Sequence, residues 1–296
     1  MHTVCTKWMN SSISLCVFLS ICLCLSLSLS VCLSDPTEKV HLYACKRFLN
    51  FAARTPYKMV YGELGRHPIK INYFVKAVKF WFRLLHKDAT RIPYNAYRML
   101  ASLNSDGKCN WVTKLRLLLH ETGFGYVWLT QGVGDEQHFI WIFRQRPTDI
   151  NFQEWVAGLN ESSRFVLYRE FKTALNADTY LDCIKQKCFR DCLVRIRLGI
   201  SNLKVDKNRN ARSDVPQDND CLFCPGMQDN ELHLFFVCKK YEKIRPNVLK
   251  NIEPHHEHSQ FVKLMSCQVD SVTRQMAWFR FKCFETRHKL LESETT

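Results

Sequence analysis

Three cysteines and one histidine, Cys221, Cys224, His233 and Cys238, have the residue types and the spacing of a metal site. Two residues separate the first two cysteines, eight separate Cys224 from His233, and four separate His233 from Cys238. Zinc prefers tetrahedral thiolate and imidazole ligands, and four protein ligands leave no position for a catalytic water. The sequence therefore predicts one structural zinc ion bound by these four residues.

Other interpretations of these residues stay open. The four residues can be unrelated, with reduced thiols, or Cys221 and Cys224 can form a disulfide. His255, His256 and His258 form a possible substitute ligand set, although histidine runs without cysteines are more typical of solvated loops. The combination of thiols and imidazole at this spacing favours the zinc site over each of these alternatives.

No common catalytic motif accompanies the predicted zinc site. The chain has no Gly-x-Ser-x-Gly, no His-Glu-x-x-His, no phosphate-binding loop and no adjacent aspartate pair of the kind that a two-metal polymerase uses. Asp214, Asp218 and Asp220 lie near one another, but in a polar stretch without predicted fixed geometry. We therefore expect a protein that is not an enzyme and has no small-molecule substrate.

The charge of the chain points to an anionic partner. The 296 residues carry a formal net charge of +14. Between residues 36 and 100 there are 13 Lys and Arg against three acidic residues, a net of +10. Such a balance favours nucleic acid or an anionic membrane surface, although a basic face that only keeps the protein soluble is an alternative.

The N-terminal segment has three competing interpretations. Residues 13–33 carry no charge, which fits a signal peptide or, at about 20 residues, a membrane-spanning helix. The alternation of Leu and Ser over residues 25–30 favours a low-complexity tract instead. If the segment targets or inserts, the secretory route or a membrane is the expected location. Otherwise we expect the body of the chain in the nucleus or the cytoplasm.

The cysteines are distributed unlike a disulfide framework. Of 15 cysteines, five lie in the N-terminal segment and three in the predicted zinc site, and the other seven occur singly in apolar, helix-like stretches. A reduced cysteine in such a stretch behaves as a small hydrophobic residue. The pattern therefore favours a reducing compartment.

The body of the chain is predicted to be mainly α. Apolar residues recur at helical spacing in several segments, whereas only two short ones have the composition of strands. The predicted helices are 39–51, 59–65, 71–85, 94–103, 111–120, 150–159, 163–175, 180–198 and 231–238, and the predicted strands are 127–128 and 139–143.

These elements suggest a helical array followed by a small zinc knuckle and a C-terminal helix. The predicted division is a hydrophobic low-complexity segment (1–35), a basic helical region (36–203), a polar linker (204–220), the zinc knuckle (221–250) and a helical tail (251–296). In the helix 71–85, Lys76, Lys79 and Arg83 lie on a face beside the apolar stripe, which makes them candidate contacts to nucleic acid.

In its sequence context the zinc knuckle resembles the one near the C-terminus of LINE-type (non-LTR) retrotransposon reverse-transcriptase polyproteins. The resemblance rests on the two cysteines and on five further positions, Glu231, His233, Cys238, Tyr241 and Arg245. Two upstream stretches, 53–69 together with Phe80-Trp81 and 189–203, resemble the same region of that family. The likeness covers roughly residues 42–287, and only the knuckle is specific.

The resemblance implies RNA or DNA handling as an accessory to reverse transcription. The Asp-Asp motif of the polymerase domain and the endonuclease domain are absent from this sequence, so those activities are not carried over. We expect a non-catalytic remnant that binds RNA or single-stranded DNA. Phe223 or Phe235 would stack an exposed base, while Lys239 and Lys240 meet phosphates. The alternative is a secreted or membrane-anchored cysteine-rich structural protein.

Overall fold

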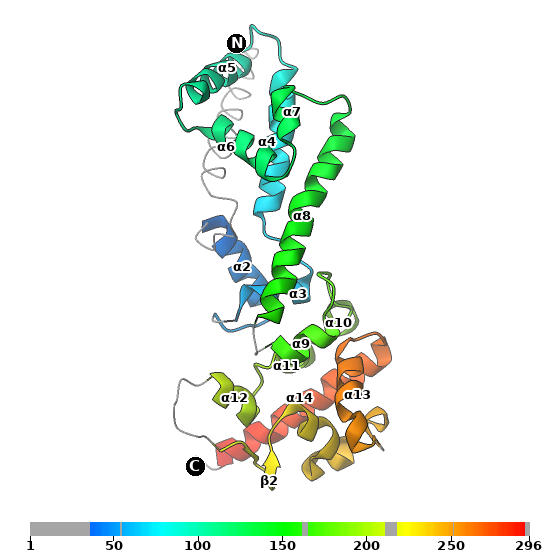
Figure 1. Ribbon diagram of the computed structural model, residues 1–296. Helices are drawn as coiled ribbons and strands as arrows, with labels where there is room; N and C mark the ends of the chain where they lie inside the picture. Colours follow the sequence, from blue (N-terminus) through cyan, green and yellow to red (C-terminus); the bar gives the residue numbers. More distant parts are fainter. Residues whose placement is uncertain (1–35, 54, 162–164, 211–217, 251, 294–296) are drawn as a thin grey trace, which may run out of the picture. The chain divides into compact units, whose positions relative to one another are not determined.

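The computed structural model describes residues 36–53, 55–161, 165–210, 218–250 and 252–293 (Figure 1). The prediction of a mainly α protein is confirmed, since within these ranges a single two-stranded antiparallel sheet accompanies the helices. The elements are α2 (Pro36–Phe48), α3 (Tyr57–Leu64), α4 (Lys70–Leu85), α5 (Ile92–Ser105), α6 (Trp111–Glu121), α7 (Gly125–Leu129), α8 (Glu136–Asn160), α9 (Val166–Phe171), α10 (Tyr180–Cys183), α11 (Lys187–Arg197), α12 (Lys204–Asn210), β1 (Asp220–Cys221), β2 (Cys224–Gln228), a π-helical turn η2 (His233–Val237), the short 3₁₀ helices η3 (Lys239–Ile244), η4 (Asn247–Leu249) and η5 (Pro254–His256), α13 (Glu257–Met265) and α14 (Asp270–Ser293).

The chain divides into two compact units. Unit 1 takes residues up to 42 together with 67–154, and unit 2 takes residues 43–66 together with those from 155 onwards. The region 36–203, expected to be one basic helical region, thus contributes residues to both units.

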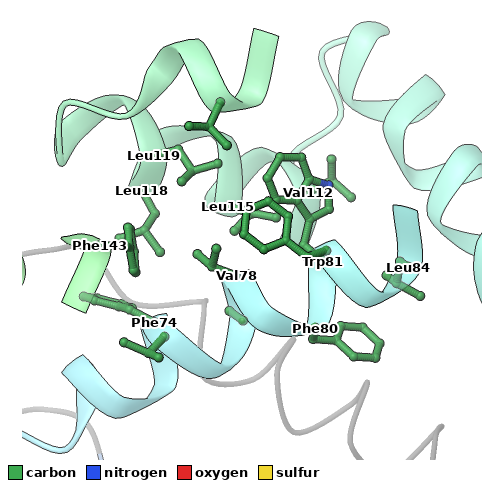
Figure 2. Close-up of a cluster of buried hydrophobic side chains, with 14 of the residues drawn as sticks. Phe74, Val78, Phe80, Trp81, Leu84, Val112, Leu115, Leu118, Leu119 and Phe143 are labelled. Atoms are coloured by element: carbon green, nitrogen blue, oxygen red, sulfur yellow. The ribbon is translucent and has the colours of Figure 1, made fainter. Parts of the chain in front are cut away.

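Unit 1 is built around α4, which is apolar on most of its sides. Its exposed positions, 72, 76, 79 and 83, share one helix face, and the remaining surface packs into a cluster with α5, α6, α7 and α8 (Figure 2). At its centre the ring of Trp81 stacks on Trp128 at 5.5 Å, and the indole N–H of Trp81 donates to the Tyr97 hydroxyl at 3.1 Å. Burial of each such aromatic side chain contributes about 1.5–3 kcal/mol.

The predicted strands 127–128 and 139–143 are wrong, because both segments are helical, in α7 and α8. Along α8 the residues Phe139, Phe143 and Pro147 are buried at intervals of four, which is a helical rather than a strand period. The helix continues through Pro147, although proline cannot donate the backbone hydrogen bond of a helix interior.

Unit 2 packs α11 along α14, with α10 and α13 against α14 and α9 against α13, while α3 reaches α11 through Glu63 (Figure 1). A buried ionic cluster joins these elements. Arg197 donates to both carboxylate oxygens of Glu63 at 3.1 and 3.0 Å and to Asp178 at 3.0 Å, and its Nη1 contacts the carbonyl of Met265. Tyr180 donates to Glu63 at 2.6 Å. Burial alone would lower the pKa of Arg197, but the carboxylate of Glu63 raises it well above its usual range.

Two predicted segments of unit 2 are corrected by the structure. The predicted helix 180–198 is two helices, α10 and α11, with Ile184 extended and buried between them. Residues 204–210 of the predicted linker form the helix α12, because Asp206, buried at its first turn, accepts hydrogen bonds from the backbone and hydroxyl of Ser201 at 3.0 and 2.6 Å.

The segment 13–33, for which we considered membrane insertion, lies outside the described residues. Among the helices that the structure describes, none combines the length and the apolar character that a membrane crossing requires.

Candidate metal centre

The first two cysteines are placed by a β-hairpin. β1 pairs with β2 in antiparallel register, with Cys221 opposite Cys224, so that the chain reverses between them. The carboxylate of Asp220 accepts a hydrogen bond from the backbone of Gly226 at 2.9 Å, and Gly226 has a φ of 78°. That left-handed conformation favours glycine, so the irregular part of β2, where the pairing register shifts, needs the residue that the sequence provides there.

His233 and Cys238 are brought together by the π-helical turn η2. The two residues are five positions apart, and in an α-helix they would point about 140° away from each other. Instead the backbone N–H of Cys238 donates to the carbonyl of His233 at 2.7 Å, which closes a wider turn. Asn230 caps the start of this segment by accepting from the backbone of His233 at 2.9 Å.

The four predicted ligands converge in space. Their ligand atoms, three sulfurs and a ring nitrogen, all lie within 4.8 Å of one another. The Sγ of Cys238 lies 3.9 Å from that of Cys221 and 3.8 Å from that of Cys224. Two sulfurs bound to one tetrahedral ion at about 2.3 Å are about 3.8 Å apart, whereas a disulfide requires about 2.05 Å. The geometry therefore fits a shared metal ion and not a disulfide.

The imidazole of His233 is left without a protein partner. It is only 5% exposed, and neither ring nitrogen has a hydrogen-bond partner among the described residues. A buried, unsatisfied polar group costs about 1–3 kcal/mol, so such a nitrogen requires an explanation. Burial also lowers the pKa of His233, which favours the neutral form that binds metals. A metal ion at the centre of the four residues would satisfy one of the two nitrogens.

The thiols and their surroundings have complementary charges. Burial raises the pKa of Cys238 to about 12, so without an ion this thiol keeps its proton. Three thiolates on a divalent ion would give the centre a charge of −1. Arg245 and Arg287 lie near enough to affect the pKa of His233, and Arg245 also donates to the carbonyl of Cys238 at 2.7 Å. Since Arg287 is paired with Asp229, Arg245 is the cation that offsets the charge of a loaded site.

Asp229 fixes the metal-binding segment to the helices of unit 2. Its carboxylate forms a buried two-point ion pair with Arg287 of α14, at 3.0 and 2.5 Å, and accepts from the backbone of Lys204 at 2.8 Å. Its own backbone donates to Asn219 at 2.7 Å. Asp229, Asn230 and Arg287 are not among the residues that the sequence predicts for this site. The pair Asp229-Asn230 before a helical segment is a recognisable capping signal. No local feature of the sequence indicates the pairing of Asp229 with Arg287, which lies 58 residues further along the chain.

The residues predicted to contact nucleic acid are only partly available. Lys239 and Lys240 are exposed on η3, and the Nζ of Lys240 lies 5.3 Å from the ring centre of Phe223, which is half-buried. Phe235 is wholly buried, packing against Phe261 and Phe279 at 5.5 and 5.6 Å. The prediction that Phe235 stacks a base is therefore wrong, because it is a core residue.

The predicted basic face of α4 is exposed in unit 1. Lys76, Lys79 and Arg83 all face solvent, and the guanidinium of Arg83 lies over the ring of Phe80 at 5.7 Å.

The other candidate polar clusters have separate places in the structure. The ligand atoms of Glu253, His255 and His256 also lie within 4.8 Å of one another but belong to exposed side chains, whereas His258 pairs with Glu170 at 2.7 Å. The ten cysteines in the described part of the chain are all free, including the three of the metal site. Asp218 pairs with Lys204 at 2.5 Å, and Asp214 lies outside the described residues.

A scan against protein-family profiles, a search of curated proteins and a search of solved structures each found no match. The site is therefore interpreted from its own geometry and chemistry.

Proposed function

We propose that this chain is a non-catalytic nucleic-acid-binding protein with one structural zinc ion, related to the C-terminal region of LINE-type retrotransposon reverse-transcriptase polyproteins. The observation that carries the proposal is the convergence of Cys221, Cys224, His233 and Cys238, followed at once by the exposed lysines of η3. The resemblance of the sequence to that family supports the choice of partner.

Zinc is the ion that the ligand set favours. Three thiolates and one imidazole in a tetrahedral arrangement are typical of structural zinc sites, whereas magnesium, calcium and manganese prefer oxygen ligands. The sulfur separations of 3.8 and 3.9 Å fit zinc–sulfur bonds of ordinary length. Four protein ligands complete the shell, so the ion would hold the hairpin and the π-turn together and leave no position for substrate.

Single-stranded RNA is the proposed ligand of the knuckle. Lys239, Lys240 and Lys243 are exposed along one short helix, where they can meet successive phosphates. Phe223 presents a half-buried ring beside Lys240, which fits stacking of an unpaired base rather than contact with a paired one. The free state of all ten described cysteines supports this function over a disulfide-linked secreted protein.

The zinc proposal is tested by native mass spectrometry of the full chain. We expect one zinc ion with free thiols, and loss of that ion in Cys224→Ser. Cys109→Ser is the matched control, since Cys109 is an exposed cysteine in unit 1. A chain that carries disulfides and no metal would overturn the proposal.

RNA binding is tested by fluorescence anisotropy with a labelled 12-nucleotide RNA. We expect affinity to fall steeply between about 50 and 200 mM salt, because each phosphate contact releases counterions. Lys239→Ala/Lys240→Ala should weaken binding and reduce the slope by about two, since each lost phosphate contact lowers it by about one. Lys108→Ala/Lys289→Ala removes the same charge from two other exposed lysines. Equal effects of the two pairs, or an affinity independent of salt, would argue against a phosphate site at the knuckle.

A further inference from the structure

A groove in unit 2 lies apart from the metal centre. One wall is formed by Lys185 and Gln186 of the connection from α10 to α11 together with Phe189 of α11, and the other is a face of α14. The α14 residues that line it recur at spacings of three and four positions and share one face of the helix: Ser271, Arg274, Gln275 and Trp278. Its volume of about 610 Å³ lies within the roughly 300–1,000 Å³ of sites that hold small organic groups.

The groove offers aromatic surface to solvent. Trp278 is 38% exposed although it lies on a helix whose neighbouring residues Ala277 and Phe279 are wholly buried. Across from it, the ring of Phe189 is half-buried and packs against the ring of Phe281, with ring centres 4.9 Å apart. An exposed indole beside a second aromatic ring is a stacking surface for a flat ligand.

The polar side chains of the groove are available to a ligand. Lys185 and Arg274 supply two positive charges, and the lining itself contains no carboxylate, although the carboxylates of Asp270 and Asp182 lie close enough to act on the lining residue Cys183. Within the described residues, neither cation has an ion pair, and the side-chain amides of Gln186 and Gln275 have no hydrogen-bond partner. Amides can pair with the edge of a base, and the two cations can meet its phosphates.

We infer that this groove binds a nucleotide, with its base on Trp278 and its phosphate at Lys185 and Arg274. The inference rests on the proposed function, which it extends by adding a second contact for the RNA strand. The chemistry that is recognised, a base with an anionic phosphate, is the same in a strand and in a free mononucleotide.

The test measures the affinity of the full chain for the labelled 12-nucleotide RNA. We expect Trp278→Ala to bind roughly tenfold more weakly, as loss of one stacked base predicts, and Trp278→Phe to recover most of that loss. Lys185→Ala/Arg274→Ala should also bind more weakly and with a smaller salt slope. Trp141→Ala is the matched control, since Trp141 is 65% exposed in unit 1. Helical circular dichroism confirms that each variant is folded.

A second arm adds uridine monophosphate. Displacement of RNA by the mononucleotide, or its direct binding in a Trp278-dependent manner, assigns the groove to a free nucleotide. If uridine monophosphate does not bind but Trp278→Ala strongly weakens the binding of RNA, the groove is assigned to the RNA strand.

The outcomes separate the groove from the knuckle. If RNA binding is weakened by Lys239→Ala/Lys240→Ala but not by Trp278→Ala, and uridine monophosphate does not bind, only the groove inference is overturned. If the unmodified chain binds no RNA at all, the proposed function is overturned, and the mononucleotide arm still decides the groove.

Discussion

The interiors of the two units contain different kinds of side chain. Among the described residues, unit 1 buries a single charged side chain, Glu38, and two neutral polar ones, Thr122 and Asn151, and the rest of its core is aromatic and aliphatic. Unit 2 buries nine charged side chains: Glu63, Lys172, Asp191, Arg197, Asp206, Asp229, Glu231, Arg280 and Arg287. It also contains the three thiols and the imidazole of the metal site.

This difference has consequences for stability. An apolar core depends on area and packing, which respond little to pH or to ligands. A buried charge depends on its partner, and removal of one member of a pair leaves the other uncompensated in a medium of low dielectric constant. Unit 2 should therefore respond to metal, pH and single charge changes much more strongly than unit 1.

Removal of the metal should produce the largest difference between the units. Structural zinc contributes on the order of 10 kcal/mol to the folding of small sites, so a strong chelator should release the segment 218–250 and the part of α14 that it packs on through Arg287. Hydrogen exchange read by mass spectrometry follows the two units separately. We expect exchange to rise in 218–250 and to stay slow in α4 and α6. A chelator that leaves 218–250 protected, or that accelerates α4 equally, would contradict the comparison.

Removal of Arg197 should have the next largest effect. Arg197→Met leaves Glu63 buried without its cation, whereas Asp178 is half-buried and keeps Lys172 at 2.8 Å. The loss of the Glu63 partner is expected to destabilise unit 2 by about 3–5 kcal/mol. Phe143→Ala in unit 1 should lose a similar amount through the cavity it creates. Hydrogen exchange of α11 and of α4 measures the two losses separately.

The two variants should differ in whether a second change restores stability. Glu63→Gln added to Arg197→Met removes one uncompensated charge, so the double variant should be less destabilised than the sum of the single changes. No polar change is expected to rescue Phe143→Ala. Strict additivity of Arg197→Met and Glu63→Gln would show that the ionic cluster is not the source of the loss.

Alkaline pH should also distinguish the units. Burial raises the pKa of Cys283 to about 12, against the effect of Arg280, and it raises the pKa of Cys267 to about 11. Because the folded state holds these protons more tightly, their contribution is complete below the unfolded pKa near 9. It is lost as pH rises towards the folded pKa, at about 1.4 kcal/mol per pH unit for each thiol. Cys283→Ala should therefore reduce the pH dependence of the unfolding free energy between pH 9 and 10.5 by about 1.4 kcal/mol per pH unit, the contribution of one thiol.

The control for this titration is Cys109→Ala, an exposed cysteine of unit 1. It should leave the alkaline slope unchanged. The same slope in wild type and Cys283→Ala would mean that this thiol does not titrate with unfolding.

The sequence predicted what is local in both units. The apolar stripe of α4 and the types and spacing of the four metal ligands could be read directly, because a helical period and a ligand set are short-range patterns. The strand prediction for 139–143 failed because aromatic and β-branched composition is only a weak preference, whereas the four-residue burial period of α8 comes from packing.

What could not be predicted depends on long-range partners. The sequence predicts Phe235 as a possible stacking residue because nothing near it indicates that Phe261 and Phe279 cover its ring. The helix at 204–210 looks like a linker by composition, and it is positioned by Asp229, 25 residues further on. The pairing of Arg197 with Glu63 spans 134 residues. Unit 2 was therefore the harder unit to predict, since its interior is polar and its partners are distant.

The smallest effect is expected at a local feature of unit 1. Asn110 caps α6 by accepting from the backbone of Val112 at 2.8 Å, and its amide also donates to the carbonyl of Leu100 at 2.9 Å. Asn110→Ala should destabilise unit 1 by about 1 kcal/mol through loss of the cap. Asn110→Asp keeps the accepting oxygen and loses the donor, so urea unfolding should place it between wild type and Asn110→Ala. Because the cap involves neither a buried charge nor the metal, Asn110→Ala should lose the same amount of stability with and without chelator. A loss of stability that depends on the chelator would show that the two units are not energetically separate.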